Sequence, residues 1–195
     1  MESDVKRWLT RDGEAFLRDL GIKKGQVVLD FGCGAGHYAI PAAKTVGKAG
    51  KVYALDKDKG ALAQVMQEAK SEGIDHIVPV ATSGELNIRL EDESVEAVLL
   101  FDTLHYMTRD ERRVLYHEVH RVLADDGVLL VYPKHHRMDH PFWNFKDMSL
   151  EEVVEEIEWA NFCLDRKSSK NLLHNDSYNA GVVLHFKKMG SDPEP

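Results

Sequence analysis

Short apolar runs alternate with longer amphipathic segments along the first two thirds of the chain. Runs such as Val27-Val28-Leu29 are typical of buried strands. Segments with apolar residues on one helical face, such as Leu62, Val65, Met66 and Ala69, are typical of helices that pack on a sheet. We predict strands at 27–30, 51–55, 76–81, 97–101 and 128–132, and helices at 39–46, 58–72 and 110–123. This alternation indicates a parallel sheet with helices on both faces.

The two ends of the chain follow other patterns. Residues 2–20 have helical spacing of apolar positions, and Asp12-Gly13 is expected to interrupt them. Ser149 and Glu152 have the spacing of a capping box, which predicts a helix start. A turn is predicted at 125–127. Two further strands at 163–168 and 181–188 are predicted to flank a polar loop at 174–180, and a hairpin-like pair there would place an antiparallel strand in the sheet. The predicted fold class is α/β, a Rossmann-like doubly wound sheet of seven mostly parallel strands with an antiparallel last strand.

Composition narrows the classes of function. The chain has 195 residues, 43% of them hydrophobic, and a formal net charge of −8, so one domain with a real core is expected and no basic footprint for nucleic acid is evident. No apolar run is long enough to span a bilayer, and the N-terminus lacks the apolar core of a signal peptide. The two cysteines, Cys33 and Cys163, are expected to be reduced thiols. These features predict a cytoplasmic protein and leave its oligomeric state open.

The stretch Asp30–Gly36 carries the most chemical information. An acid at a predicted strand end precedes glycines at 32, 34 and 36, and a predicted helix follows. The dinucleotide fingerprint G-x-G-x-x-G would place its third glycine at position 37, where this chain has His37. A carboxylate would repel a diphosphate and attract a cationic cosubstrate. The stretch therefore favours S-adenosylmethionine over NAD, with an NAD-dependent oxidoreductase or an unrelated glycine-rich turn as alternatives.

Three ordered motifs carry a resemblance to a known family. Residues 27–36, residues 51–56, and residues 118–123 followed by Gly127 resemble successive motifs of class I S-adenosylmethionine-dependent methyltransferases. Within that family the chain resembles the small group that includes the ubiquinone- and menaquinone-biosynthesis methyltransferases. The resemblance extends from about Lys24 to Lys188. It implies one methyltransferase domain over residues 1–195, with S-adenosylmethionine as methyl donor and S-adenosylhomocysteine as product.

The resemblance also implies roles for individual residues. The backbone around Gly32, Cys33, Gly34 and Gly36 would line the methionine part of the cosubstrate, and Asp30 would act near its ammonium group. The cofactor-binding residues implied on the other strands are Asp56 for the ribose hydroxyls, Lys57 beside the adenine, Ser83 near the adenine amine and Phe101 at the methionine end. The third motif departs from the family pattern, because an acidic residue is usual where Ser83 stands; Glu85 is the alternative, and a loop without ligand contact remains open.

The acceptor side of the pocket is less defined. Asp102 and His105 are candidate general bases, with a purely structural histidine as the alternative for His105. We expect a helical cap at 1–24, with Trp8 and Phe16, a substrate-side lid at 134–148, and a frayed tail at 190–195. Three histidines within the lid, at 135, 136 and 140, raise the question of a metal, but their spacing matches no recognised zinc pattern and no metal is expected. The predicted partner is a small-molecule acceptor. A non-catalytic S-adenosylmethionine-binding module is the alternative function.

Overall fold

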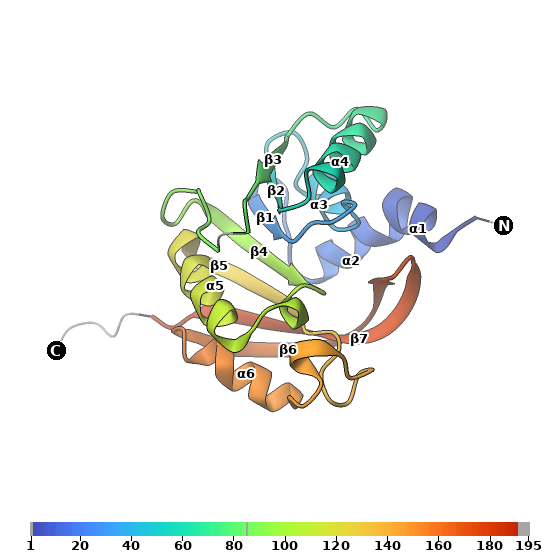
Figure 1. The fold of residues 1–195 in the computed structure, drawn as a ribbon. Helices are drawn as coiled ribbons and strands as arrows, with labels where there is room; N and C mark the ends of the chain where they lie inside the picture. Colours follow the sequence, from blue (N-terminus) through green and yellow to red (C-terminus); the bar gives the residue numbers. More distant parts are fainter. Residues whose placement is uncertain (1, 85, 191–195) are drawn as a thin grey trace.

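The computed structural model describes residues 2–84 and 86–190, and its described residues form a seven-stranded sheet of order β3-β2-β1-β4-β5-β7-β6 (Figure 1). Neighbouring strands from β3 to β5 are parallel, β7 is antiparallel to β5, and β6 is antiparallel to β7. The strands are β1 Val27–Phe31, β2 Lys51–Asp56, β3 Ile77–Ala81, β4 Val95–Phe101, β5 Leu123–Tyr132, β6 Phe162–His174 and β7 Ser177–Lys188. The predicted fold class is confirmed.

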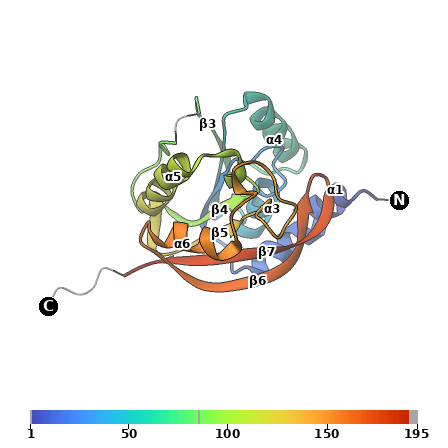
Figure 2. The same ribbon diagram turned by 60° about the horizontal axis from the view of Figure 1, so that its bottom comes forward.

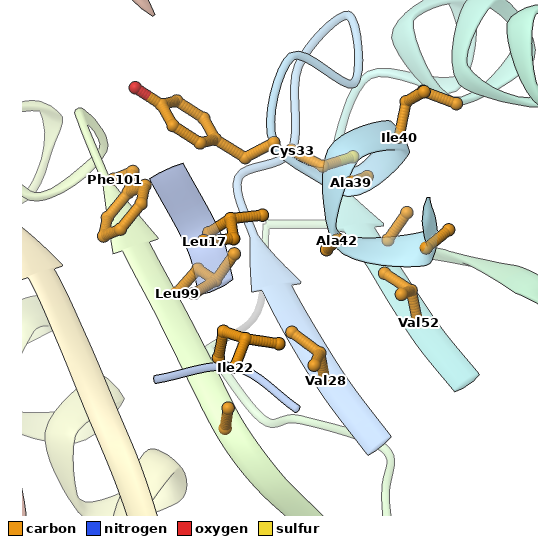
Figure 3. Packing of buried hydrophobic residues seen from close by; sticks show 14 of the residues in the cluster. Leu17, Ile22, Val28, Cys33, Ala39, Ile40, Ala42, Val52, Leu99 and Phe101 are labelled. Atoms are coloured by element: carbon orange, nitrogen blue, oxygen red, sulfur yellow. The ribbon is translucent and has the colours of Figure 1, made fainter. Parts of the chain in front are cut away.

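Helices cover both faces of this sheet. One face carries the N-terminal helical segment, α3 and α4, and their apolar residues share a core with alternate residues of the strands, among them Val28, Val52 and Leu99 (Figure 3). The other face carries α5 and α6, which pack on residues such as Leu29 and Val98. The helical segments are α1 Asp4–Arg7, a π-helical turn η1 Trp8–Asp12, α2 Gly13–Asp19, α3 Ala39–Val46, α4 Lys59–Ser71, η2 Leu104–Tyr106, α5 Arg109–Val122, η3 Trp143–Phe145 and α6 Leu150–Glu158.

Local sequence signals fix several helix starts. The predicted capping box at Ser149 and Glu152 opens α6, and a second one at Thr108 and Glu111 opens α5. The interruption predicted at Asp12-Gly13 is wrong, because helical structure continues through η1 into α2. Gly13 serves close packing instead: a Cβ there would lie 2.7 Å from Cγ of Pro41 on α3.

Two turn predictions need correction. Residues 125–127 belong to β5, within a register irregularity that pairs Val95 with Leu123 and Ala97 with Val128. The hairpin-like pair is confirmed, but the loop bounds of 174–180 are wrong, since β6 and β7 are joined by Asn175-Asp176. Both turn residues have positive φ, 47° and 63°, as a two-residue type I′ turn requires. Of the predicted tail at 190–195, residues 191–195 lie outside the described residues.

The β6–β7 hairpin curves away from the plane of the sheet toward the N-terminal helices (Figure 2). Its inner residues Leu172, Leu173 and Val183 are buried in the same core as Trp8. The Tyr178 hydroxyl donates to Oδ2 of Asp12 at 2.7 Å, which ties the hairpin to the N-terminal helices. This curvature brings the hairpin turn to the carboxyl edge of the central strands.

Candidate functional site

A cavity of about 620 Å³ opens at the carboxyl edge of β1, β2 and β4. This is the edge at which open α/β sheets bind ligands. The wall at one end comes from the turns after β1, β2 and β3, and the wall at the other from the end of β4 and the β6–β7 hairpin. The first end includes Gly32, Cys33, Gly34, Asp56, Lys57, Thr82 and Gly84; the second includes Phe101, Asp102, Thr103, Tyr106, Leu173, His174 and Asn175.

The glycine turn after β1 needs its glycines for different reasons. Gly32, Gly34 and Gly36 all have positive φ, at 74°, 50° and 85°. A Cβ on Gly32 would lie 2.6 Å from Oγ1 of Thr103, and one on Gly36 would lie 2.9 Å from Cγ2 of Val65, whereas one on Gly34 would meet nothing within 4 Å. Gly36 is not part of the cavity wall and instead permits close packing against α4. Gly34 is the position where a ligand can approach the backbone closely.

Asp56 at the end of β2 holds this turn in place. Its Oδ2 accepts from the Gly34 amide at 2.8 Å, and its Oδ1 accepts from the Asp58 amide at 2.9 Å. Asp58 in turn caps α4 by accepting from the Gly60 amide at 2.7 Å. Each carboxylate oxygen has more than one lone pair, so Asp56 can also accept hydrogen bonds from a ligand in the cavity.

Asp30 lies behind the cavity wall and is only 2% exposed. Burial, together with the nearby carboxylate of Asp56, raises the pKa of Asp30 to about 7. Its Oδ2 has no hydrogen-bond partner among the described residues. Burial also raises the pKa of the Cys33 thiol, so this residue of the cavity wall stays protonated at neutral pH.

The remaining predicted cofactor residues occupy different positions around the cavity. Lys57 and Phe101 contribute to its wall. Ser83 does not, although its neighbours Thr82 and Gly84 do, and Glu85 lies outside the described residues. The Thr82 amide donates to the Asp56 carbonyl at 3.1 Å, which extends the hydrogen bonding between the ends of β2 and β3.

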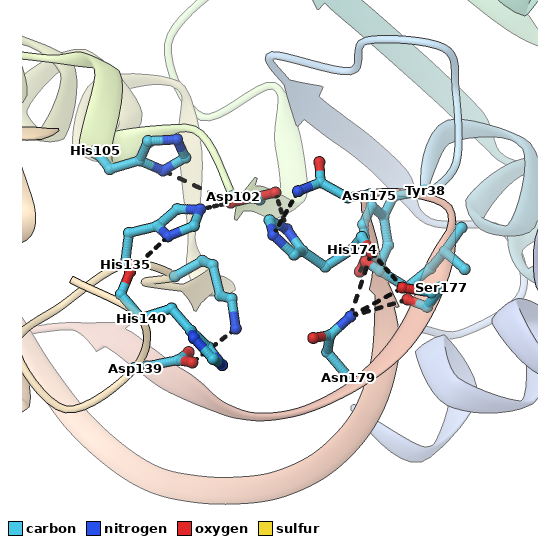
Figure 4. Close-up of polar contacts among 12 residues, drawn as sticks. Tyr38, Asp102, His105, His135, Asp139, His140, His174, Asn175, Ser177 and Asn179 are labelled. Atoms are coloured by element: carbon cyan, nitrogen blue, oxygen red, sulfur yellow. Dashed lines mark hydrogen bonds and ion pairs between the residues drawn. The ribbon is translucent and has the colours of Figure 1, made fainter. Parts of the chain in front are cut away.

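A polar cluster forms the second end of the site (Figure 4). Nδ1 of His174 lies 2.5 Å from Oδ2 of Asp102, and Nδ2 of Asn175 lies 3.0 Å from Nε2 of His174. Nε2 of His135 lies 4.0 Å from Oδ1 of Asp102, and Nδ1 of His105 lies 3.6 Å from the same oxygen. Burial raises the pKa of Asp102, although His174 and His135 act in the opposite direction.

The two predicted catalytic residues are close together, but only one of them contributes to the cavity wall. Asp102 does so, whereas His105 is 2% exposed and lies behind it. Burial and the neighbouring His135 and His174 lower the pKa of His105 to about 3, so its ring is neutral. Tyr106 and Trp143 pack on the His105 ring with centroids 4.0 and 5.4 Å away.

The segments expected to cover the cavity do not contribute Trp8, Phe16 or residues 134–148 to its described wall. Trp8 and Phe16 are buried in the core, and the Trp8 indole donates to the His37 carbonyl at 2.7 Å. Residues 134–148 contribute no side chain to the described cavity wall. That segment reaches the site through His135, beside Asp102, and through Trp143, whose ring lies 4.3 Å from that of Tyr106.

Sequence reasoning missed the hairpin residues of the site. His174 and Asn175 belong to the predicted polar loop. The sequence motifs assign no role to Thr103, whose side chain packs against Gly32. The Asn175-Asp176 pair was the available signal, because Asn and Asp tolerate the positive φ of a two-residue hairpin turn. Nothing in the sequence alone pairs His174 with Asp102.

Comparison with known proteins identifies the family. A family model described as a methyltransferase domain matches residues 28–127, just over half of the chain. A 2-phytyl-1,4-naphtoquinone methyltransferase from Trichormus variabilis is 26% identical over 72% of this chain and 61% of its own length. A demethylmenaquinone methyltransferase from Geobacillus stearothermophilus is 30% identical over 57% of this chain and 47% of its own length. The chain thus spans less than two thirds of the length of these curated relatives.

Solved structures agree with this assignment. The crystal structure of an S-adenosylmethionine-dependent methyltransferase from Aquifex aeolicus matches with a TM-score of 0.73 and 26% identity, covering 92% of both chains. These matches give no support to the NAD-dependent alternative. None of the helices within residues 2–84 and 86–190 has the length and apolar composition of a membrane-spanning segment. The matched domain, the glycine turn and the order of the strands together show that the chain belongs to the methyltransferase-domain family, among the class I methyltransferases that use S-adenosylmethionine.

Proposed function

We propose that the protein transfers the methyl group of S-adenosylmethionine to a small molecule bound beside Asp102 and His174. One observation carries the proposal: a single cavity of about 620 Å³ joins the glycine turn and Asp56 to that polar cluster. The volume falls within the range of about 300–1,000 Å³ that is usual for small-molecule sites. Cosubstrate and acceptor would therefore meet inside one cavity.

The residues at the first end fit S-adenosylmethionine. Asp30 has a buried oxygen without a partner among the described residues, and Gly34 leaves its backbone open to the cavity. Asp56 is a hydrogen-bond acceptor at the strand end where a ribose diol would lie. Asp30 near the ammonium group, and Lys57 or the residues after β3 near the adenine, remain part of this proposal.

The bound sulfonium supplies the reactive methyl group. The chain itself has to align the acceptor with that group and exclude water, which lowers the barrier chiefly through positioning. Phe101 and Tyr38 form an apolar wall with ring centroids 4.7 Å apart, and Tyr106 covers the cavity beside Asp102. An acceptor with an apolar ring and a polar group directed at Asp102 and His174 fits this wall.

The printed names of the relatives suggest where to search for the acceptor. Two of them are named for quinone-type rings, so hydroquinones are the first class to test here. The net charge of −8 disfavours a nucleic-acid partner. A cytoplasmic location belongs to the same proposal and agrees with the two free thiols, Cys33 and Cys163.

Two measurements test the proposal. Calorimetry with S-adenosylhomocysteine should show binding, and NAD should give none under the same conditions. Purified protein with labelled S-adenosylmethionine should then methylate a member of a panel of hydroquinones, phenols, thiols and amines. Binding without methylation across the panel would favour the non-catalytic module, and absence of binding would refute the proposal.

A further inference from the structure

Three side chains with metal-binding atoms meet at the acceptor end of the cavity. Asp102 follows β4, His135 lies in the loop after β5, and His174 ends β6. One ligand atom from each lies within 4.8 Å of the other two. Figure 4 shows the His135 and His174 rings on either side of the Asp102 carboxylate, although they come from three separate parts of the chain.

Two buried atoms in this cluster have their hydrogen-bonding capacity unused. Oδ1 of Asp102 and Nδ1 of His105 are buried, 3.6 Å apart, and have no hydrogen-bond partner among residues 2–84 and 86–190. Leaving a buried polar atom unpaired is unfavourable, so the great majority of such atoms in proteins have a partner. A cation bound by Asp102 would satisfy its oxygen.

The His135 ring is already oriented as a metal ligand, and the His174 ring would become one after rotation of a neighbouring amide. Nδ1 of His135 lies 2.9 Å from the His140 carbonyl and donates to it, which leaves Nε2 unprotonated and facing Asp102. Such a second hydrogen bond is what fixes the tautomer of metal-binding histidines. His174 presents Nδ1 to Asp102, and rotation of the Asn175 amide would let its carbonyl oxygen accept from Nε2.

The spacing of the donor atoms also suits a metal ion. Ligands about 2.0–2.1 Å from a tetrahedral zinc ion lie roughly 3.3 Å from one another. Here His174 lies 2.5 Å from Oδ2 of Asp102 and His135 lies 4.0 Å from Oδ1, so binding of one ion would lengthen the first distance and shorten the second. The backbone is unusual as well, since Asp102 and His135 both have positive φ, 55° and 72°. Conformations of this kind concentrate at functional sites.

We propose that Asp102, His135 and His174 bind a divalent transition-metal ion of the zinc type, with His105 beside it. Two imidazoles and one carboxylate are a ligand set that suits such ions and leaves coordination positions open. Asp102 and His174 belong to the cavity wall, so an open position faces the cavity. The buried cation Lys134, which precedes His135, is paired with Asp139 at 2.6 Å, so its charge is balanced.

The site has a consequence for substrate class that rests on the proposed function. A metal ion at this position would hold an oxygen, nitrogen or sulfur atom of the acceptor at the methyl-transfer end of the cavity. Acceptors would then be ligands for zinc in their own right, such as thiols, imidazoles or hydroxyls adjacent to a second donor atom.

Metal titration of the purified, chelator-treated chain tests the site. Calorimetry with Zn²⁺ should show one ion per chain, and Co²⁺ should give the visible absorption of a histidine- and carboxylate-bound ion. The variants His135→Ala and His174→Ala should each weaken Zn²⁺ binding by more than about 100-fold. His117→Gln on the exposed face of α5 is the matched control and should bind Zn²⁺ within about twofold of the native chain.

The outcomes distinguish a metal site from a cluster held together by hydrogen bonds alone. Absence of stoichiometric Zn²⁺ binding and of Co²⁺ absorption in the native chain would overturn the proposal and leave Asp102 and His174 as a hydrogen-bonded pair only. Equal binding by His135→Ala and the native chain would overturn it too. Asp102→Asn and His174→Asn, which conserve shape better, replace any variant that fails to fold. S-adenosylhomocysteine binding measured on the same samples tests the proposed function separately.

Discussion

The His174 ring and the Asp102 carboxylate lie 2.5 Å apart, although they are 72 positions apart in the chain. Asp102 follows β4 and His174 ends β6, and the strands β5 and β7 lie between β4 and β6 in the sheet. In a flat sheet the two residues would therefore be too far apart to interact. The hairpin reaches Asp102 because it curves over the sheet and buries Leu172 and Leu173 in the core. The Tyr38 hydroxyl donates to the Leu173 carbonyl at 2.7 Å and holds the curved strand beside the glycine turn.

Replacing Asp56 with alanine should weaken S-adenosylhomocysteine binding. The carboxylate orders the glycine turn through the Gly34 amide and is the acceptor offered to a ribose. Loss of hydrogen bonds to a charged group is worth about 1.5–3 kcal/mol, which corresponds to roughly 10- to 100-fold in affinity. Calorimetry measures the change. Asp75→Asn is the control, because that exposed side chain precedes β3, away from the cavity, and should leave affinity unaltered. Equal affinities of the two variants would contradict this role for Asp56.

Gly32→Ala and Gly34→Ala should affect the protein in different ways. Both impose positive φ on a residue with Cβ, which costs about 1–2 kcal/mol. Gly32→Ala also drives Cβ against Oγ1 of Thr103, at 2.6 Å, and overpacking adds about 1–3 kcal/mol. We expect Gly32→Ala to be the less stable variant in urea unfolding. Gly34→Ala should mainly weaken ligand binding, because its Cβ projects into open space at the cavity. Its free energy of unfolding should fall only by the cost of the positive φ.

The double variant Gly32→Ala/Thr103→Ala tests the cause of that difference. Removing Oγ1 should restore about 1 kcal/mol relative to the sum of the single variants. Purely additive free energies would show that the strain of Gly32→Ala comes from its backbone alone.

Replacing Glu156 should destabilise the face of the sheet that carries α5 and α6. Arg112 donates to both of its carboxylate oxygens, at 2.6 and 2.8 Å, and both side chains are almost fully buried. Removing one partner of a buried ion pair costs about 3–5 kcal/mol, because the other charge stays buried. Glu156→Gln should therefore melt about 10 °C below the native chain. The exposed neighbour Glu155 supplies the matched control, and equal melting of Glu155→Gln and Glu156→Gln would contradict the prediction.

Much of the fold was predictable because its signals are local. Buried parallel strands such as β1 and β4 are short apolar runs, and the capping box at Ser149 marks the start of α6. The length of the hairpin was harder to predict because β6 is an edge strand whose middle part, residues 165–171, is polar and mostly exposed. Charged edge strands protect a sheet from pairing with other chains, but they also hide the alternation that marks a strand.

The residues of the site also divide into those that local sequence predicts and those that tertiary packing brings together. Residues of the glycine turn and Asp56 follow from short motifs, since each sits directly after a strand that the sequence reveals. Asp102 was singled out for the same reason. Its partners His135 and His174 depend on the curvature of the hairpin and on the path of the loop after β5, which are set by tertiary packing.

Asp30 should make the stability of the protein fall as pH rises toward neutrality. Its pKa is about 7 in the folded chain and about 3.9 when unfolded, so between these values the folded state holds a proton that the unfolded state has released. Stability is therefore greatest at the acidic end of this window and is lost as Asp30 ionises. The loss amounts to about 2.5 kcal/mol between pH 5 and pH 8.

Asp30→Asn removes this ionisation while keeping an oxygen that can accept from the Ala39 amide. The difference in unfolding free energy between Asp30→Asn and the native chain, measured in urea from pH 5 to pH 8, should grow with pH in favour of the variant. A difference that stays constant across this range would contradict the raised pKa. With saturating S-adenosylhomocysteine, an ammonium group beside Asp30 would lower the pKa of Asp30. The pH range over which the two unfolding free energies diverge would then shift to lower pH. If that pH range does not change when the ligand is bound, the ammonium group does not lie beside Asp30.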